Sequence, residues 1–233
     1  MREPGHPLTL SMVVLTASTG LIEAVSLLAL GPVFTAMQTG NVLFLSFGAA
    51  GARGLPALCP AVSLLAFAVG AVCGARAEAR YAARGRRWVV LGLLGEAVLI
   101  AGAAAVGWGL TARFGSPTPR HLAVTALLAF AMGLRNVTAM RVGVPGVPTT
   151  LVTRTLTALL GSSLGHDATF GHGAAAWGPR AAALLAMFAG GLTGALLVGA
   201  GWTVNWLLVP PLALVLLVAA VRLAYPALGP RPT

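Results

Sequence analysis

Residues 32–49 read PVFTAMQTGNVLFLSFGA, and residues 147–164 read VPTTLVTRTLTALLGSSL. Both stretches are largely apolar, but each is shorter than the ~20 residues that cross a bilayer as a helix. Each also carries several polar side chains. Short segments of this kind are typical of half-helices that enter the membrane and turn back. Whether they cross decides how many spans the chain has, and therefore its fold.

The whole chain has the composition of a polytopic membrane protein. Its 233 residues are 58% hydrophobic and 9% charged, with a mean hydropathy of +0.89, whereas soluble domains carry about 25% charged residues. A net charge of +10 on so apolar a chain favours a membrane as the partner over nucleic acid. We therefore expect no nucleic-acid partner and no sizeable soluble domain.

Eight apolar windows follow one another along the chain, each bounded by Gly, Pro or Arg. They cover residues 9–30, 33–50, 57–75, 88–110, 121–140, 148–164, 181–200 and 202–224. If all eight cross, the loop arginines divide six against seven between the two sides. If the second and sixth windows turn back, they divide ten against three. The ten are Arg2, Arg76, Arg80, Arg84, Arg86, Arg87, Arg141, Arg180, Arg222 and Arg231, and the three are Arg53, Arg113 and Arg120.

Cytoplasmic loops of membrane proteins are enriched in basic residues, so the uneven division is the expected one. It predicts an all-α polytopic membrane protein with six transmembrane helices plus two half-length or re-entrant helices, and with both termini cytoplasmic. The use of Arg without Lys, together with abundant Ala and Gly, indicates a GC-rich bacterial genome. We therefore expect the protein in a bacterial cytoplasmic (inner) membrane.

Three motifs recur in the same order in the two halves of the chain. They are Gly20–Glu23 with Gly133–Asn136, 113 residues later; Thr39 with Thr153, 114 residues later; and the Gly70/Gly74 pair with Gly190/Gly194, 120 residues later. Ordered matches of this kind indicate a duplication, and three crossings per copy make the second copy inverted. We predict two inverted repeats, residues 1–112 and 113–233, in one integral membrane domain. The Gly-x-x-x-Gly pairs predict close helix packing.

Ionisable residues inside apolar windows are the first functional candidates, because each costs roughly 2.5–3.5 kcal/mol on insertion scales. Glu23, Glu96, Arg135 and Arg154 are placed in this way. Two readings of Glu23 stay open. In the first, it pairs with Arg135 or Arg154 only to hold the two halves together. In the second, the residues are functional: one acid binds a proton or cation, or an arginine binds an anionic group of a substrate. For Glu96 we expect a local pair or hydrogen bond.

Thr39, Gly40 and Asn41 begin the apolar run of the second window and so mark the start of a half-helix. A helix start presents free backbone N–H groups to an anion or polar ligand, although capping alone also explains these residue types. The sixth window carries a matching cluster of threonines around Arg154. The candidate substrate-binding residues are Glu23, Thr39, Gly40, Asn41, Asn136, Thr153, Arg154 and Thr155.

Other motifs predict little chemistry. The chain has no nucleotide-binding loop, dinucleotide fingerprint, zinc-protease helix or nucleophile elbow, so we expect neither an enzyme nor a cofactor. Two histidines and an aspartate between residues 166 and 172 are too few for a metal site. The basic stretch after the third window is expected to bind anionic lipid headgroups. Its arginines are Arg76, Arg80, Arg84, Arg86 and Arg87.

Five motifs extend over most of the chain. They are Gly20-x-x-Glu23-Ala-x-Ser26, Leu30-Gly31-x-x-Phe34-Thr-Ala, Thr39-Gly40-Asn41, Met132-Gly133-Leu-x-Asn136, and Gly143-Val-Pro145 followed by Thr149-Thr150-x-x-Thr153. In this combination, from about residue 9 to 220, the chain resembles the YoaK-like family of bacterial integral membrane proteins. The resemblance implies an integral membrane fold in a family defined by a domain of unknown function. It implies no substrate, cofactor or catalytic residue.

The residues favour a small secondary transporter or permease for a small polar or anionic solute, with its site at two half-helix ends near mid-membrane. The alternative is a noncatalytic membrane scaffold or accessory subunit, whose buried polar residues serve packing. An intramembrane enzyme is disfavoured, because no nucleophile, base and oxyanion donor come together. The sequence leaves open the solute, the direction of transport, the coupling ion and whether copies associate.

Overall fold

The computed structural model describes residues 6–82, 87–112, 116–142, 156–157, 160 and 173–225, and in these residues it contains helices and no strand. The helices are α1 (His6–Val25) with a π-helical turn η1 (Ser26–Leu30), α2 (Gln38–Ala49), α3 (Leu58–Ala82), α4 (Arg87–Val106), α5 (Pro119–Val142), α7 (Gly173–Gly199), α8 (Val204–Leu207) and α9 (Val209–Ala224).

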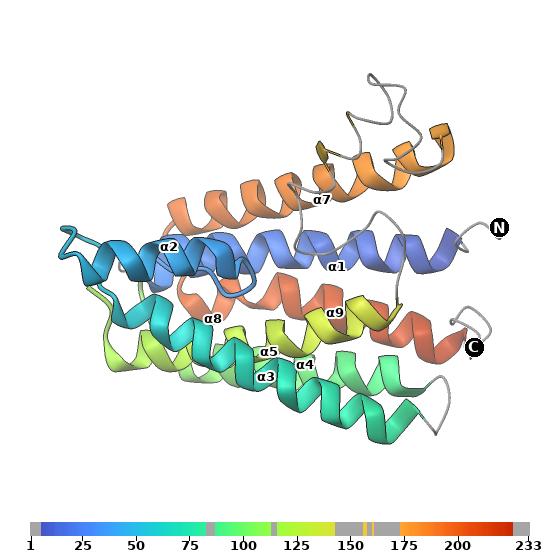
Figure 1. The fold of residues 1–233 in the computed structure, drawn as a ribbon, viewed down its shortest axis with the longest axis horizontal. Helices are drawn as coiled ribbons and strands as arrows, with labels where there is room; N and C mark the ends of the chain where they lie inside the picture. Colours follow the sequence, from blue (N-terminus) through green and yellow to red (C-terminus); the bar gives the residue numbers. More distant parts are fainter. Residues whose placement is uncertain are drawn as a thin grey trace.

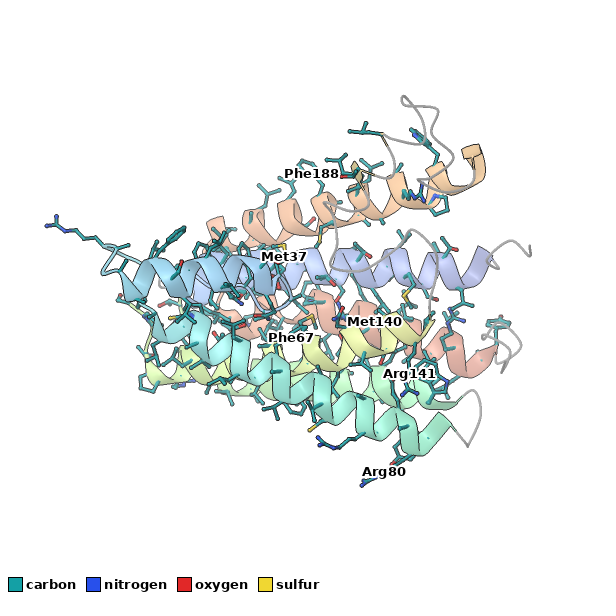
Figure 2. The ribbon with its side chains drawn as sticks, viewed as in Figure 1. Met37, Phe67, Arg80, Met140, Arg141 and Phe188 are labelled. Atoms are coloured by element: carbon teal, nitrogen blue, oxygen red, sulfur yellow. The ribbon has the colours of Figure 1, made fainter. Side chains whose placement is uncertain are left out.

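Six segments of the described chain are long and apolar enough to cross a membrane. They are Leu8–Leu30, Leu58–Tyr81, Trp88–Val106, Pro119–Val142, Trp177–Gly199 and Val204–Ala224. The described residues thus contain the six helices of spanning length and apolarity that the sequence predicts. Large apolar side chains such as Phe188 and Met140 point away from the bundle (Figure 2). An apolar exterior of this extent fits the hydrocarbon of a bilayer.

The helices lie along one axis and have two common ends (Figure 1). We call one the termini end, where α1 begins and α9 ends, and the other the α2 end, where α2 ends and α3 begins. Helix α1 packs along α7, and α3 packs along α5, while α4 and α9 complete the bundle. Helices α1 and α7 run in one direction, and α3 and α5 run in the opposite one.

Glycines allow the two main helix pairs to pack closely. A Cβ atom on Gly20 of α1 would overlap the backbone of Met187 on α7, and one on Gly133 of α5 would overlap the backbone of Phe67 on α3. Gly70 and Gly190 contact the partner backbone in the same way. The prediction that the Gly-x-x-x-Gly pairs mediate close packing is confirmed for Gly70 and Gly190.

The second apolar window does not cross the bundle. Helix α2 has 12 residues and is therefore only about 18 Å long. After α1 reaches the α2 end, residues 31–37 return toward the middle of the bundle, and α2 runs back to the α2 end (Figure 1). Gly31 makes the turn possible with φ 135° and ψ 179°, a conformation almost confined to glycine. Most of the sixth window lies outside the described residues.

Candidate functional site

Glu23 lies on α1 beneath the extended segment 31–37. One carboxylate oxygen, Oε1, accepts hydrogen bonds from Thr35 N–H at 3.1 Å, Thr35 Oγ1 at 2.9 Å and Ala36 N–H at 2.6 Å. The side chain is 5% exposed, and in the described part of the chain Oε2 is buried without a hydrogen-bond partner. The carboxylate therefore satisfies backbone N–H groups that have no helical partner in the extended segment. Its second oxygen, Oε2, remains available to another donor.

Asn41 holds the other side of segment 31–37. Its Oδ1 accepts from Phe34 N–H at 2.9 Å, and its Nδ2 donates to the Phe34 carbonyl at 2.6 Å. Nδ2 also lies 2.7 Å from Gln38 Oε1 and 3.1 Å from Ser63 Oγ. The Ser63 hydroxyl, on α3, donates to the Phe34 carbonyl at 2.6 Å. Asn41 thus pairs with Phe34 as a neighbouring strand would, and it is fully buried.

The predicted site residues are placed in different surroundings. Thr39 is exposed at the first turn of α2, and Asn136 is half-buried on α5. Gly40 packs against the Phe34 ring, because an added Cβ would lie 2.7 Å from a ring carbon. Thr153, Arg154 and Thr155 lie outside the described residues. The structure therefore brings Glu23, Gly40 and Asn41 together around segment 31–37. The predicted second half of the site, residues 153–155, lies outside the described residues and stays a prediction.

Arg135 does not pair with Glu23. It forms an ion pair with Glu96 of α4, and both side chains are buried. Its guanidinium also donates to the Leu15 carbonyl at 3.1 Å, Thr19 Oγ1 at 2.8 Å and Ser18 Oγ at 3.1 Å, all on α1. The proposed Glu23–Arg135 pair is wrong because Glu23 turns toward segment 31–37. The expected pair or hydrogen bond for Glu96 is confirmed.

Two of the polar clusters in the described residues that the sequence did not predict connect separate segments of the bundle. Glu78 of α3 accepts from Thr138 Oγ1 at 2.7 Å and lies 2.9 Å from the Arg141 guanidinium. This cluster connects α3 to α5 at the termini end. Ser63 and Phe34 form the second missed group. Ser63 is a lone serine in the apolar run at 57–75, and this could have identified it as a polar contact inside the bundle. Nothing in the sequence identifies the Phe34 carbonyl as its partner.

The chemistry open to Glu23 and segment 31–37 is the binding of a hydrogen-bond donor and the exchange of a proton. Glu23 Oε2 is a bare carboxylate oxygen beside the broken backbone of a re-entrant segment, so it can accept a proton or a hydrogen-bond donor. Among the described residues, no group of three or more His, Cys, Asp or Glu side chains comes together to hold a metal ion. Glu23 bonds the N–H groups of Thr35 and Ala36, which lie just before α2 begins at Gln38.

Comparison with known proteins identifies the family. A model described as "Protein of unknown function (DUF1275)" matches residues 11–221. The chain is also 25% identical over 151 residues to the UPF0700 transmembrane protein YoaK of Bacillus subtilis (strain 168). That match covers 65% of this chain and 64% of the relative, a little under two thirds of the relative's length. No solved structure matches the chain. The resemblance to the YoaK-like family is confirmed, and this multi-pass membrane protein belongs to the DUF1275 family.

Proposed function

We propose that the protein is a small secondary transporter or permease for a small polar or anionic solute, with its site beside segment 31–37. The observation that carries this proposal is the Glu23 carboxylate, which is buried within a spanning helix while its Oε2 is bare. An ionisable side chain in a span is costly and usually marks a solute or ion pathway. A helix broken near mid-membrane is the usual setting of such a site.

Two inverted repeats, 1–112 and 113–233, are part of this proposal. The order of buried and half-buried residues over 11–20 recurs unchanged over 124–133, and that over 61–70 recurs over 181–190. The close glycine contacts between α1 and α7 also recur between α5 and α3. Helices α1 and α5 run in opposite directions (Figure 1). These correspondences support an alternating-access mechanism in which one repeat moves against the other.

Proton exchange at Glu23 would couple such a movement to a proton gradient. The charged carboxylate accepts three hydrogen bonds from Thr35 and Ala36, and bonds to a charged acceptor are about twice as strong as neutral ones. A proton on Glu23 weakens its hold on segment 31–37, and its loss restores that hold. Because these N–H groups already face a carboxylate, an anionic group of the solute is expected at Arg154 in the second half.

A ligand screen tests the proposal. Full-length protein in detergent is heated with small anions, amino acids and metabolites at several pH values, because a ligand that binds the native state raises the midpoint of unfolding. Wild type is compared with Glu23→Gln and Arg154→Ala, and Ser46→Ala serves as the control, since Ser46 is exposed on α2. We expect a solute that stabilises wild type and the control but neither site variant.

Transport of that solute is then measured in proteoliposomes with and without an imposed proton gradient. Gradient-driven uptake that disappears in Glu23→Gln supports proton coupling. Equal uptake in wild type and Glu23→Gln contradicts the role of Glu23.

The alternative, a noncatalytic scaffold or accessory subunit, is favoured by the internal bonding of Asn41 and Arg135. Both side chains are satisfied largely by the protein's own groups, as expected of residues that specify packing. In that case Glu23→Gln lowers the amount of folded protein, and no solute of a broad panel stabilises wild type. Normal abundance together with lost solute binding argues for the transporter instead.

The orientation proposal places the termini end in the cytoplasm of a bacterium. Among the described residues, and leaving aside Arg135 inside the bundle, six arginines lie toward this end and two toward the α2 end. The six are Arg76, Arg80, Arg87, Arg141, Arg180 and Arg222, and the two are Arg53 and Arg120. Figure 2 shows Arg80 and Arg141 toward this end. The stretch from Arg76 to Arg87 would then meet anionic headgroups of the inner leaflet.

Labelling of single cysteines tests the orientation. Arg53→Cys and Arg80→Cys are placed in a chain whose Cys59 and Cys73 are replaced by alanine, and intact cells are treated with a membrane-impermeant maleimide. We expect reaction at position 53 in intact cells and at position 80 only after permeabilisation. The opposite pattern overturns the assignment.

A further inference from the structure

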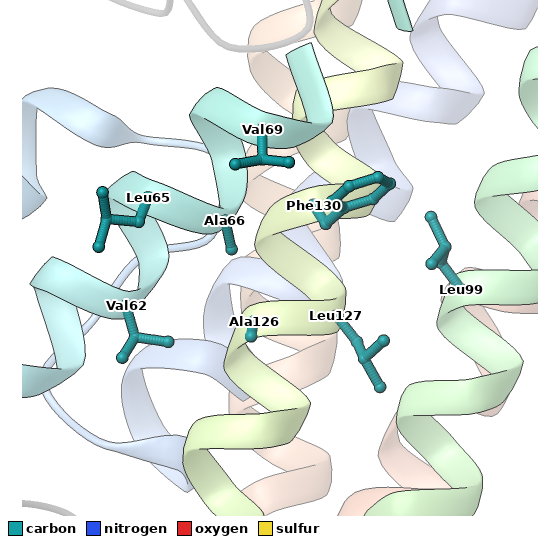
Figure 3. Close-up of a pocket in the computed structure, with 8 residues that line it drawn as sticks. All are labelled: Val62, Leu65, Ala66, Val69, Leu99, Ala126, Leu127 and Phe130. Carbon is teal, nitrogen blue, oxygen red and sulfur yellow. The ribbon is translucent and has the colours of Figure 1, made fainter. Parts of the chain in front are cut away.

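An apolar groove lies on the outer surface where α3, α4 and α5 meet (Figure 3). Its volume is about 560 Å³, within the range of roughly 300–1,000 Å³ typical of sites for single small molecules. Every lining residue is apolar. The lining consists of Val62, Leu65, Ala66 and Val69 of α3, Leu99 of α4, and Ala126, Leu127 and Phe130 of α5.

The groove is open because α4 presents little side-chain volume on this side. Gly95, Leu99 and Gly102 are spaced by four and three residues and therefore share one face of the helix. A Cβ atom added to Gly95 or Gly102 would meet nothing within 4 Å. Leu99 is thus flanked by two positions without side chains, and the space beside it is open to the surroundings of the protein.

Arg120 stands at the α2 end of the same seam between α4 and α5. It precedes Leu127 by seven residues, and it bonds Val106, which follows Leu99 by seven residues. Seven residues correspond to about 10 Å along each helix. The guanidinium donates to the Val106 carbonyl at 2.8 Å and to the Trp108 carbonyl at 2.8 Å. It is exposed, and in the described part of the chain no carboxylate pairs with it.

We propose that Arg120 and this groove form a binding site for one phospholipid, with the phosphate at Arg120 and an acyl chain along the groove. The depths agree. Trp108, beside Arg120, is 69% exposed, and exposed tryptophans mark the membrane–water interface. Phe130, the deepest α5 residue of the groove, lies ten residues from Arg120. That is about 15 Å, half of a ~30 Å hydrocarbon core.

Charge selects a lipid over a second copy of the chain as the occupant. An unpaired arginine at the interface is complementary to a phosphate. In the described part of the chain a second copy offers no comparable partner, because the acidic side chains there, Glu23, Glu78 and Glu96, are all buried. The site is separate from the proposed transport site, since among the described residues the hydrogen-bond partners of segment 31–37 include neither Arg120 nor a residue of the groove.

Native mass spectrometry of the delipidated full-length protein tests the site. The probes are phosphatidylglycerol, glycerol 3-phosphate as the headgroup without chains, and diacylglycerol as the chains without phosphate. Ala66→Phe fills the groove, and Ala186→Phe is its control at the corresponding half-buried position of α7. Arg120→Gln keeps donors for the carbonyls but removes the charge. Its control is Arg53→Gln, which removes a charge from the same end of the bundle.

We expect phosphatidylglycerol to bind wild type and both controls equally, and to bind Ala66→Phe and Arg120→Gln about tenfold more weakly. Leu65→Trp, at a groove side chain that is 69% exposed, repeats the test if Ala66→Phe does not fold. Equal lipid binding by groove variants and controls overturns the proposal. So does competition by glycerol 3-phosphate as strong as that of the lipid, or a change from dimer to monomer confined to the groove variants, which would make a second copy the occupant.

Discussion

Arg135 of α5 and Glu96 of α4 form an ion pair whose side chains are only 2% and 1% exposed. Removing one member of a buried pair leaves the other charge unpaired, which typically costs about 3–5 kcal/mol. We expect Glu96→Leu or Arg135→Leu alone to lower the free energy of unfolding by this amount, measured in detergent with a denaturant. The double variant should recover most of the loss, because two well-packed leucines leave no buried charge.

The Glu78–Arg141 pair is the control for this comparison. Arg141 is 38% exposed, and pairs that reach solvent or headgroups contribute about 0–1 kcal/mol. The Glu78 carboxylate is buried, but Arg141→Gln keeps a hydrogen-bond donor beside it, so we expect a smaller loss than in Arg135→Leu. A loss as large as that in Arg135→Leu would show that position within the bundle, and not burial of the pair, determines the cost.

Asn41→Asp tests the bonding of segment 31–37. The aspartate keeps the shape and the acceptor for Phe34 N–H, but it loses the Nδ2 donor that reaches the Phe34 carbonyl, Gln38 and Ser63. Unpaired buried acceptors cost about 1–3 kcal/mol and an uncompensated buried charge about 3–5 kcal/mol, so we expect a loss of at least about 3 kcal/mol in thermal unfolding. Thr39→Ala, at an exposed neighbour, should stay within about 0.5 kcal/mol of wild type.

Glycine-to-alanine changes distinguish packing from helix propensity. Gly20→Ala pushes α1 away from α7, and Gly133→Ala pushes α5 away from α3. In both cases the new methyl group overlaps the backbone of the partner helix. We expect losses of about 1–3 kcal/mol or more. Gly95→Ala enters open space and should stabilise by up to ~1 kcal/mol through helix propensity alone. Equal effects at Gly20 and Gly95 in an unfolding titration would contradict the packing model.

Gly31→Ala isolates the backbone of the turn. An added Cβ meets its nearest atom, Cys59 Sγ, at an ordinary 3.6 Å, so the cost comes from φ 135° and ψ 179°. We expect a loss of about 1–3 kcal/mol in thermal unfolding. Gly54→Ala is the control, since its φ of 77° lies nearer the left-handed region that other residues visit. A smaller loss at Gly31 than at Gly54 would show that segment 31–37 relaxes around the substitution.

The sequence predicts the spans well because hydropathy and length determine whether a helix can cross. The shortness of the window at 33–50 and the uneven arginines correctly exclude it as a span. Close packing at Gly70 and Gly190 was also predictable, since only glycine removes the Cβ that separates two backbones, whereas the same contacts at Gly20 and Gly133 were not predicted.

The partners of the buried charges were not predictable. Glu23 and Glu96 are both single acids in apolar runs, and their choice of partner depends on how each helix is rotated in the bundle. Nor does any sequence pattern show that Asn41 pairs with the backbone of Phe34. That bond depends on where the chain turns after Gly31.

Segment 31–37 also constrains the order in which the protein assembles. The Phe34 carbonyl has its full set of hydrogen-bond donors only when Asn41 of α2 and Ser63 of α3 are both in place. Ser63 lies 29 residues further along the chain, so α1 and α2 leave the ribosome before α3 does. A polar backbone has no water to bond at this depth in lipid. Helix α2 therefore reaches its final position only after α3 has entered the membrane, which makes its insertion a late step of biogenesis although its sequence is made early.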